Sequence, residues 1–238
     1  MNPIDRLIVA LDVDSEERAV NLIEKLQDDV MFFKVGFELF SSCGPDIVKA
    51  VTKRGCKIFL DLKFHDIPNT VSKAAVAVTR LGVSLFNVHA LGGFDMMKKT
   101  ADAVREEAER LDIMRPKILA VTILTSMDEN ALKNVGIRAT IEDEVLALAT
   151  LASQAGLDGV VASAVEARRL RQALGEDFLI VTPGVRPAGS IAGDQKRIAT
   201  PKEALENGAS HIVVGRPITE ADDPVEATRK ILEEISRN

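Results

Sequence analysis

Eight short runs of apolar, mostly β-branched residues recur along the chain, and longer amphipathic segments separate them. Continuously apolar runs of this length are typical of parallel strands that are covered on both faces. The intervening segments, such as 15–27 and 142–156, resemble surface helices, and roughly 25–35 residues make up each strand–helix unit, as in a βαβ module. Eight such units predict a (β/α)8 barrel, the TIM barrel fold, and a doubly wound open sheet is the alternative. The runs are residues 7–13, 32–37, 57–64, 85–90, 118–124, 159–163, 178–184 and 211–217.

The domain organisation follows from the length of the chain and from its uniform composition. Its 238 residues suit one large α/β domain. No linker, low-complexity segment or shift in composition divides it, so we expect a single barrel domain over residues 1–238. The longest irregular segment, 184–200, follows the seventh run and is rich in Gly, Pro and small residues. It is either an ordinary surface loop or a lid that closes over a ligand in the active site.

Composition argues against two classes of partner. The formal net charge is −6, acidic and basic residues are mixed, and the chain has no Trp and no Tyr. Without a basic stripe or aromatic stacking surfaces, nucleic acid is not an expected partner. No apolar run approaches the roughly 20 residues of a membrane span, and the N-terminus lacks the pattern of a signal peptide. We therefore expect no association with a membrane.

The cysteines and histidines indicate neither a disulfide framework nor a metal site. Cys43 and Cys56 do not have the spacing of either arrangement. His65, His89 and His211 are scattered, so a zinc site is not expected. A reducing cytoplasm is the simplest location for such a chain.

Charged residues stand at the ends of the first three runs. Asp12 ends the first run, and Lys34 lies in the second. Asp61 and Lys63 lie two residues apart in the third, hence on one face of the strand, and Asp66 follows in the loop. The carboxyl ends of barrel strands form the mouth where active sites lie. Buried charges cost free energy unless they are paired, so the cluster is either a structural ion network or catalytic machinery, and its position favours catalysis.

A second pattern indicates phosphate binding. Barrels often bind phosphate with the loops after strands seven and eight, which correspond here to 182–187 and 214–218. Gly215 permits close approach of the backbone to an anion, and Arg216 offers two parallel donors to phosphate oxygens. The alternative is that both residues merely end a strand, with Arg216 in a surface salt bridge.

These blocks together resemble one family. The stretches "LIVALDV", "FFKVGFELF", "FLDLKFHDIPNTV", "NVHALGG", "VTILTSM", "VTPGVRP", "GDQKR" and "IVVGRPI" follow in order over essentially the whole chain. They are similar to those of orotidine 5′-phosphate decarboxylases of the bacterial type, and "DLKFHDIPNT" is highly specific. The resemblance implies decarboxylation of orotidine 5′-monophosphate to UMP and CO2, the last step of de novo UMP synthesis. It also implies a homodimeric barrel that uses no metal and no organic cofactor.

The resemblance also assigns roles to individual residues. Lys63 would donate a proton to C6 of the pyrimidine. Lys34, Asp61 and Asp66 would complete a charged array, with Asp66 reaching across from the partner subunit. The remaining substrate contacts that it implies are Asp12 and Lys34 at the ribose hydroxyls, Thr70 lining the site, Thr125 and Ser126 near the base, Gln195, Gly215 and Arg216 at the phosphate, and Arg186 on the closing loop.

The chemistry of the residues agrees with this reading. Loss of CO2 without an electron sink leaves a carbanion at C6, which a fixed ammonium group can stabilise and then protonate. Three alternatives stay open. A Mg²⁺-dependent sugar-phosphate decarboxylase or aldolase of the same superfamily would lack a counterpart of Lys34. A Schiff-base aldolase is disfavoured because two close carboxylates would hold Lys63 as a non-nucleophilic ammonium. A non-catalytic binding protein for phosphate ligands would not need the intact array.

Overall fold

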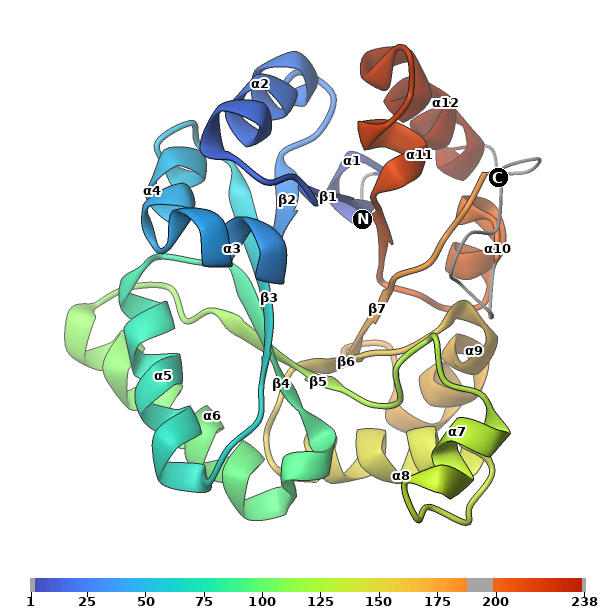
Figure 1. The fold of residues 1–238 in the computed structure, drawn as a ribbon. Helices are drawn as coiled ribbons and strands as arrows, with labels where there is room; N and C mark the ends of the chain where they lie inside the picture. Colours follow the sequence, from blue (N-terminus) through green and yellow to red (C-terminus); the bar gives the residue numbers. More distant parts are fainter. Residues whose placement is uncertain (1–2, 188–198, 237–238) are drawn as a thin grey trace.

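Eight parallel strands close a barrel, and helices surround it (Figure 1). The structure is a computed structural model that describes residues 3–187 and 199–236. Each strand pairs with the next one in sequence, and β8 closes the ring against β1 with Leu7 opposite Ile212. The predicted (β/α)8 barrel is therefore confirmed, and the open-sheet alternative is wrong. The strands are β1 (Leu7–Ala10), β2 (Phe32–Val35), β3 (Lys57–Phe64), β4 (Leu85–His89), β5 (Lys117–Val121), β6 (Gly159–Val161), β7 (Leu179–Thr182) and β8 (His211–Val214).

The helices form the outer ring, apart from short helices at the barrel ends. α1 precedes β1, and a 3₁₀ turn, Ala90–Gly92, follows β4. Side chains cap several helices where they leave the strand loops: Thr140 caps α8, and Ser163 and Glu166 form a capping box on α9. The helices are α1 (Pro3–Arg6), α2 (Glu16–Leu26), α3 (Phe37–Cys43), α4 (Asp46–Thr52), α5 (Pro68–Arg80), α6 (Phe94–Leu111), α7 (Glu129–Asn134), α8 (Ile141–Gln154), α9 (Ala164–Leu174), α10 (Pro201–Glu206), α11 (Arg216–Thr219) and α12 (Pro224–Ser236).

The core has two parts, as the continuous apolar runs require. Side chains on one face of each strand fill the space between barrel and helices, and those on the other face fill the barrel itself. The barrel interior is thus a packed core, as is usual for this fold. The interior layer consists of Ile8, Ala10, Phe32, Phe59, Leu85, Leu119, Val181 and Val213.

Most strands end before the apolar runs that predicted them. β1 ends at Ala10 and β8 at Val214, each three residues short of the predicted end, whereas β3 coincides with its run. The residues beyond the strand ends form the mouth. Asp12 and Arg216, which were expected at strand ends, therefore lie in a loop and at the start of a helix, respectively.

Some predictions concern parts of the chain outside the description. Most of the predicted lid, 184–200, and Gln195 within it lie outside the described residues. The extent of the domain over 1–238 also stays a prediction. Among residues 3–187 and 199–236, no helix combines the length and apolar character that crossing a membrane requires. The cytoplasmic location stays a prediction as well.

Candidate active site

Four charged side chains meet at the carboxyl ends of β1, β2 and β3. Lys34 Nζ lies 2.8 Å from Asp12 Oδ1 and 3.5 Å from Asp61 Oδ2. Lys63 Nζ donates to Asp61 Oδ1 at 2.7 Å. The contacts alternate in charge, so each inner group has an opposite charge on both sides. The structure brings together these four residues, which the sequence analysis placed at the mouth, while their catalytic roles stay predictions.

The two inner groups of this array are charged although they are largely buried. The side chains of Lys34 and Asp61 are 12% and 13% exposed. Burial favours the neutral form of Asp61, but the attraction of Lys34 and Lys63, with hydrogen bonds from Lys63 and Asn87, lowers its pKa below the usual range. Burial likewise opposes the charge on Lys34, but Asp61 and Asp12 raise its pKa. The opposite charges of Lys34 and Asp61 therefore stabilise each other at neutral pH.

A β-bulge in β3 shapes the array. Leu60 pairs with Phe86 and Phe64 with Val88, so three residues of β3 face a single residue of β4. Lys63 lies within this bulge with φ of 44°, in the left-handed region that residues with a Cβ seldom occupy. The bulge turns the end of β3 away from regular alternation at the position of the proposed proton donor.

Asn87 fills the place opposite the bulge, and the sequence analysis missed it. Its side chain is fully buried. Its Oδ1 accepts a hydrogen bond from the backbone N–H of Lys63 at 2.7 Å, and its Nδ2 donates to Asp61 Oδ1 at 2.7 Å. The sequence did contain a signal for this residue, because Asn87 is an amide inside an otherwise apolar run. A buried amide needs hydrogen-bond partners.

A cavity of about 170 Å³ opens beside the array. Lys34, Asp61 and Lys63 form one wall, and Thr125 contributes from the loop after β5. The combination of a charged wall and an apolar remainder is typical of a binding site for a small molecule. The apolar lining consists of Phe59, Val121, Ile123, Leu124, Val161, Pro183 and Val213.

Two glycines allow the backbone to pass close to the outer pair of charges. A Cβ at Gly36 would lie 2.9 Å from Lys34 Nζ, nearer than Cβ atoms come to other atoms. A Cβ at Gly215 would lie 3.4 Å from Asp12 Oδ2. A side chain at position 36 would therefore displace the Lys34 ammonium, whereas one at position 215 would only touch Asp12.

Two residues predicted at the phosphate, Gly215 and Arg216, follow β8, and Arg186, predicted on the closing loop, follows β7. Gly215 precedes α11, and Arg216 is its exposed first residue. Arg186 is 8% exposed, and its Nη1 donates to the carbonyl of Val185 at 2.9 Å. The backbone N–H of Arg186 donates to the carbonyl of Ala199 at 3.0 Å, which joins the two ends of the segment between them. The roles of Gly215, Arg216 and Arg186 stay predictions.

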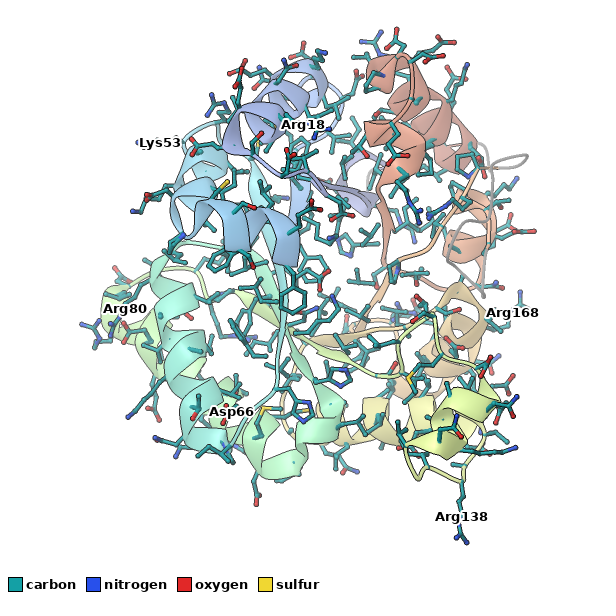
Figure 2. All side chains as sticks on the ribbon, in the orientation of Figure 1. Arg18, Lys53, Asp66, Arg80, Arg138 and Arg168 are labelled. Atoms are coloured by element: carbon teal, nitrogen blue, oxygen red, sulfur yellow. The ribbon has the colours of Figure 1, made fainter. Side chains whose placement is uncertain are left out.

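Seven of the described predicted site residues do not line the cavity of their own chain: Asp12, Asp66, Thr70, Ser126, Arg186, Gly215 and Arg216. Asp66 is exposed, its Oδ1 accepts from the backbone N–H of Ile67 at 2.6 Å, and it lies beside the start of α5 (Figure 2). Thr70, in the first turn of α5, and Ser126, after β5, are also exposed. The roles of Asp66, Thr70 and Ser126 stay predictions.

Metal-binding groups are not gathered in the part of the chain that the structure describes. No group of three or more His, Cys, Asp or Glu side chains there could hold a metal ion. The rings of His65 and His89 stack with centroids 5.3 Å apart. Cys43 and Cys56 are free thiols.

Fold and site together define a (β/α)8 barrel with an ionic array and a cavity at the carboxyl ends of its strands, where barrel enzymes carry their active sites. The model of the orotidine 5′-phosphate decarboxylase / HUMPS family matches residues 5–231, and the chain belongs to this family.

Individual relatives are similar over nearly the full length. A protein from Moorella thermoacetica named orotidine 5′-phosphate decarboxylase is 54% identical over 236 residues, which cover 99% of this chain and 94% of that protein. A protein of the same name from Nitrosococcus oceani is 51% identical over 231 residues, 97% of each chain. The crystal structure of orotidine 5′-phosphate decarboxylase from Lactobacillus acidophilus matches with a TM-score of 0.85 and 46% identity, over 96% of this chain and 98% of that one.

Proposed function

We propose that the protein decarboxylates orotidine 5′-monophosphate to UMP and CO2, as the last step of de novo UMP synthesis. Family membership and the names of relatives at about half identity support this reaction. The observation that carries it is the alternating array of Lys34, Asp61 and Lys63 against the cavity. The Mg²⁺-dependent sugar-phosphate alternative does not account for Lys34, whose ammonium occupies the space between two carboxylates.

The chemistry requires that a carbanion be stabilised and then protonated. The bond between C6 and the carboxylate breaks, CO2 leaves, and the electron pair stays on C6. An ammonium group held beside C6 stabilises that charge more than it stabilises the substrate, because the charge at C6 develops only in the transition state. Lys63 then transfers a proton to C6, and solvent returns a proton to its amine. The reaction thus needs no electron acceptor.

Asp61 holds the Lys63 ammonium in place, and Lys34 in turn holds Asp61. Asp61 accepts from Lys63 at 2.7 Å and also lies 3.5 Å from Lys34, so its carboxylate links the two cations. The substrate carboxylate would lie near Asp61, and the repulsion could raise the energy of the bound substrate. Electrostatic stabilisation of the transition state is the larger effect in this proposal. Asp12 and Lys34 bind the ribose hydroxyls.

The phosphate group supplies binding energy far from the bond that breaks. Arg216, Gly215 and Gln195 bind it, and Arg186 belongs to the segment 184–200 that closes over the substrate. Thr125, which lines the cavity, and Ser126 lie near the base. Binding energy from the phosphate can then be used to order the site around C6.

The active site is completed by a second copy of the chain in a homodimer. Asp66 and Thr70 are exposed and outside their own cavity, which supports their entry into a neighbouring site. Exposed apolar side chains lie on the same end of the barrel, on the loops after β2, β3 and β4, and such side chains mark protein interfaces. They are Phe37, Ile67, Leu91 and Phe94, which are 40–65% exposed.

Replacement of Lys63 by alanine tests the reaction and the role of the ammonium. Purified wild type should consume orotidine 5′-monophosphate, followed by the loss of its orotate absorbance. Lys63→Ala should lower kcat by more than the ~10²–10³ that a single electrostatic donor contributes, because two roles fall on one group. Binding of UMP, measured by calorimetry, should survive better than turnover.

A matched control separates this effect from the loss of any lysine. Lys133→Ala removes the same side chain from the exposed surface of α7 and should leave kcat unchanged. Near-normal turnover in Lys63→Ala would end the proposed mechanism, and no turnover by wild type would end the proposed function.

A further inference from the structure

The bulge in β3 leaves a backbone group to be satisfied. Where three residues of one strand face one residue of its neighbour, the regular ladder of hydrogen bonds is interrupted. The backbone N–H of Lys63 lies in the interrupted part of the ladder. It is partly buried, and a buried N–H without a hydrogen-bond partner costs free energy. The left-handed backbone of Lys63 must also be held by its surroundings.

One buried side chain supplies what the bulge lacks. Asn87 Oδ1 accepts from the Lys63 N–H, and Asn87 Nδ2 donates to the same Asp61 oxygen that accepts from Lys63 Nζ, each at 2.7 Å. The two partners determine the orientation of the amide, because an N–H needs the oxygen and a carboxylate needs the NH₂ group. Backbone and ammonium of Lys63 are thereby joined through Asn87 and Asp61 in one closed ring of hydrogen bonds.

We propose that Asn87 is a positioning residue for the decarboxylation, which sets the place of the Lys63 ammonium relative to C6 of the substrate. This inference rests on the proposed function. Asn87 is fully buried and is not part of the cavity lining, so it acts through Lys63 and Asp61 and does not touch the substrate.

The requirement for asparagine follows from shape and charge. Leucine has a similar volume but neither donor nor acceptor, and glutamine is longer by one methylene. Aspartate keeps the acceptor but places a second carboxylate against Asp61, and two carboxylates so close cannot both be ionised. Asparagine offers one donor and one acceptor at the correct reach and without charge.

Loss of the ring should affect the chemical step more than substrate binding. A displacement of about 1 Å in a catalytic group can cost on the order of 100-fold in rate. The contacts assigned to ribose and phosphate, from Asp12, Lys34 and Arg216, come from other strands, and the closer partner of Lys34 is Asp12 at 2.8 Å, which is not part of the bulge. A purely structural role would lower kcat and ligand affinity together with stability.

The test compares Asn87→Leu and Asn87→Asp with wild type. For each, kcat and KM for orotidine 5′-monophosphate are measured from pH 5.5 to 8, together with UMP affinity and thermal unfolding. Asn87→Leu should lose about 100-fold in kcat, with KM and UMP affinity close to wild type. For Asn87→Asp, the ratio of its kcat to that of wild type should rise as pH falls, because the protonated carboxyl can donate to Asp61 as the amide does.

Asn134→Asp is the matched control, because it makes the same change at the exposed end of α7. The ratio of its kcat to that of wild type should not vary with pH. A wild-type kcat in Asn87→Leu, or a flat ratio in Asn87→Asp, would overturn the positioning role while leaving the proposed function intact. Equal losses of kcat, UMP affinity and stability would make Asn87 a structural residue. Absence of turnover by wild type would overturn both proposals.

Discussion

Replacing His211 by glutamine should change how the free energy of unfolding depends on pH. His211 begins β8 at the end of the barrel opposite the mouth, and its ring packs edge-on against Phe32 with centroids 6.0 Å apart. Its Nδ1 is buried and without a hydrogen-bond partner among the described residues. Burial, aided by the charges of Arg6 and Lys57, lowers the pKa of His211 to about 4, and Asp5 opposes this only in part.

The size and sign of the effect follow from proton linkage. Between pH 6.5 and about 4 the unfolded chain protonates this histidine while the folded chain keeps it neutral, so acid favours unfolding. At about 1.4 kcal/mol per pKa unit, the full loss is about 3 kcal/mol, of which about 2 kcal/mol is gone by pH 4.5. His211→Gln has no such group, so its stability should fall less over this range.

Urea unfolding of both proteins at pH 7.5 and pH 4.5, at one protein concentration, measures the difference. The variant should be the less stable protein at pH 7.5, because it loses the ring that packs on Phe32. The difference in the free energy of unfolding between the two proteins should be smaller by about 2 kcal/mol at pH 4.5. The titration of other groups is common to both proteins and cancels in this comparison. An equal gap at both pH values would refute the reasoning.

Three further predictions concern the active site. Lys63→Ala chains mixed with Asp66→Asn chains should regain roughly a quarter of wild-type activity, since half of randomly paired dimers are hybrids with one intact site. No recovery, despite subunit exchange seen by native mass spectrometry, would place Asp66 in the site of its own chain. Arg216→Ala should raise KM for the nucleotide and lower kcat/KM, with little effect on the free nucleoside; equal effects on both substrates would indicate a structural arginine. EDTA should leave turnover unchanged, because Lys34 and Lys63 already neutralise Asp61, and activity that Mg²⁺ restores would favour the sugar-phosphate alternative.

The barrel could be predicted because its strands are apolar on both faces and its helices on one. The strand ends could not, because apolar character continues past the last ladder hydrogen bonds. Leu11 and Val13 follow β1 but are buried all the same, since the loop that carries Asp12 packs over the core. At the mouth, residues can be buried without belonging to a strand. The apolar pattern of the sequence predicts which residues are buried, but not which of them are in strands.

The site could be predicted in part. Asp61 and Lys63 were expected on one face by regular alternation, and they are in contact, but β3 reaches this arrangement through a bulge. Asn87 was missed because its role depends on that bulge. A single amide in an apolar run does not reveal which partners it has across the sheet.

The sequence alone determined the order of the strand–helix units and which strand bears each charge, because these depend on neighbours along the chain. The tertiary structure decided which charges meet. Asp12 and Lys34 are separated by 22 positions and Asp61 and Asn87 by 26, so the pairing and register of neighbouring strands bring them within 2.8 Å and 2.7 Å. The tertiary structure also decided the left-handed backbone of Lys63. That conformation costs free energy locally, and the hydrogen bond to Asn87 on the neighbouring strand offsets the cost.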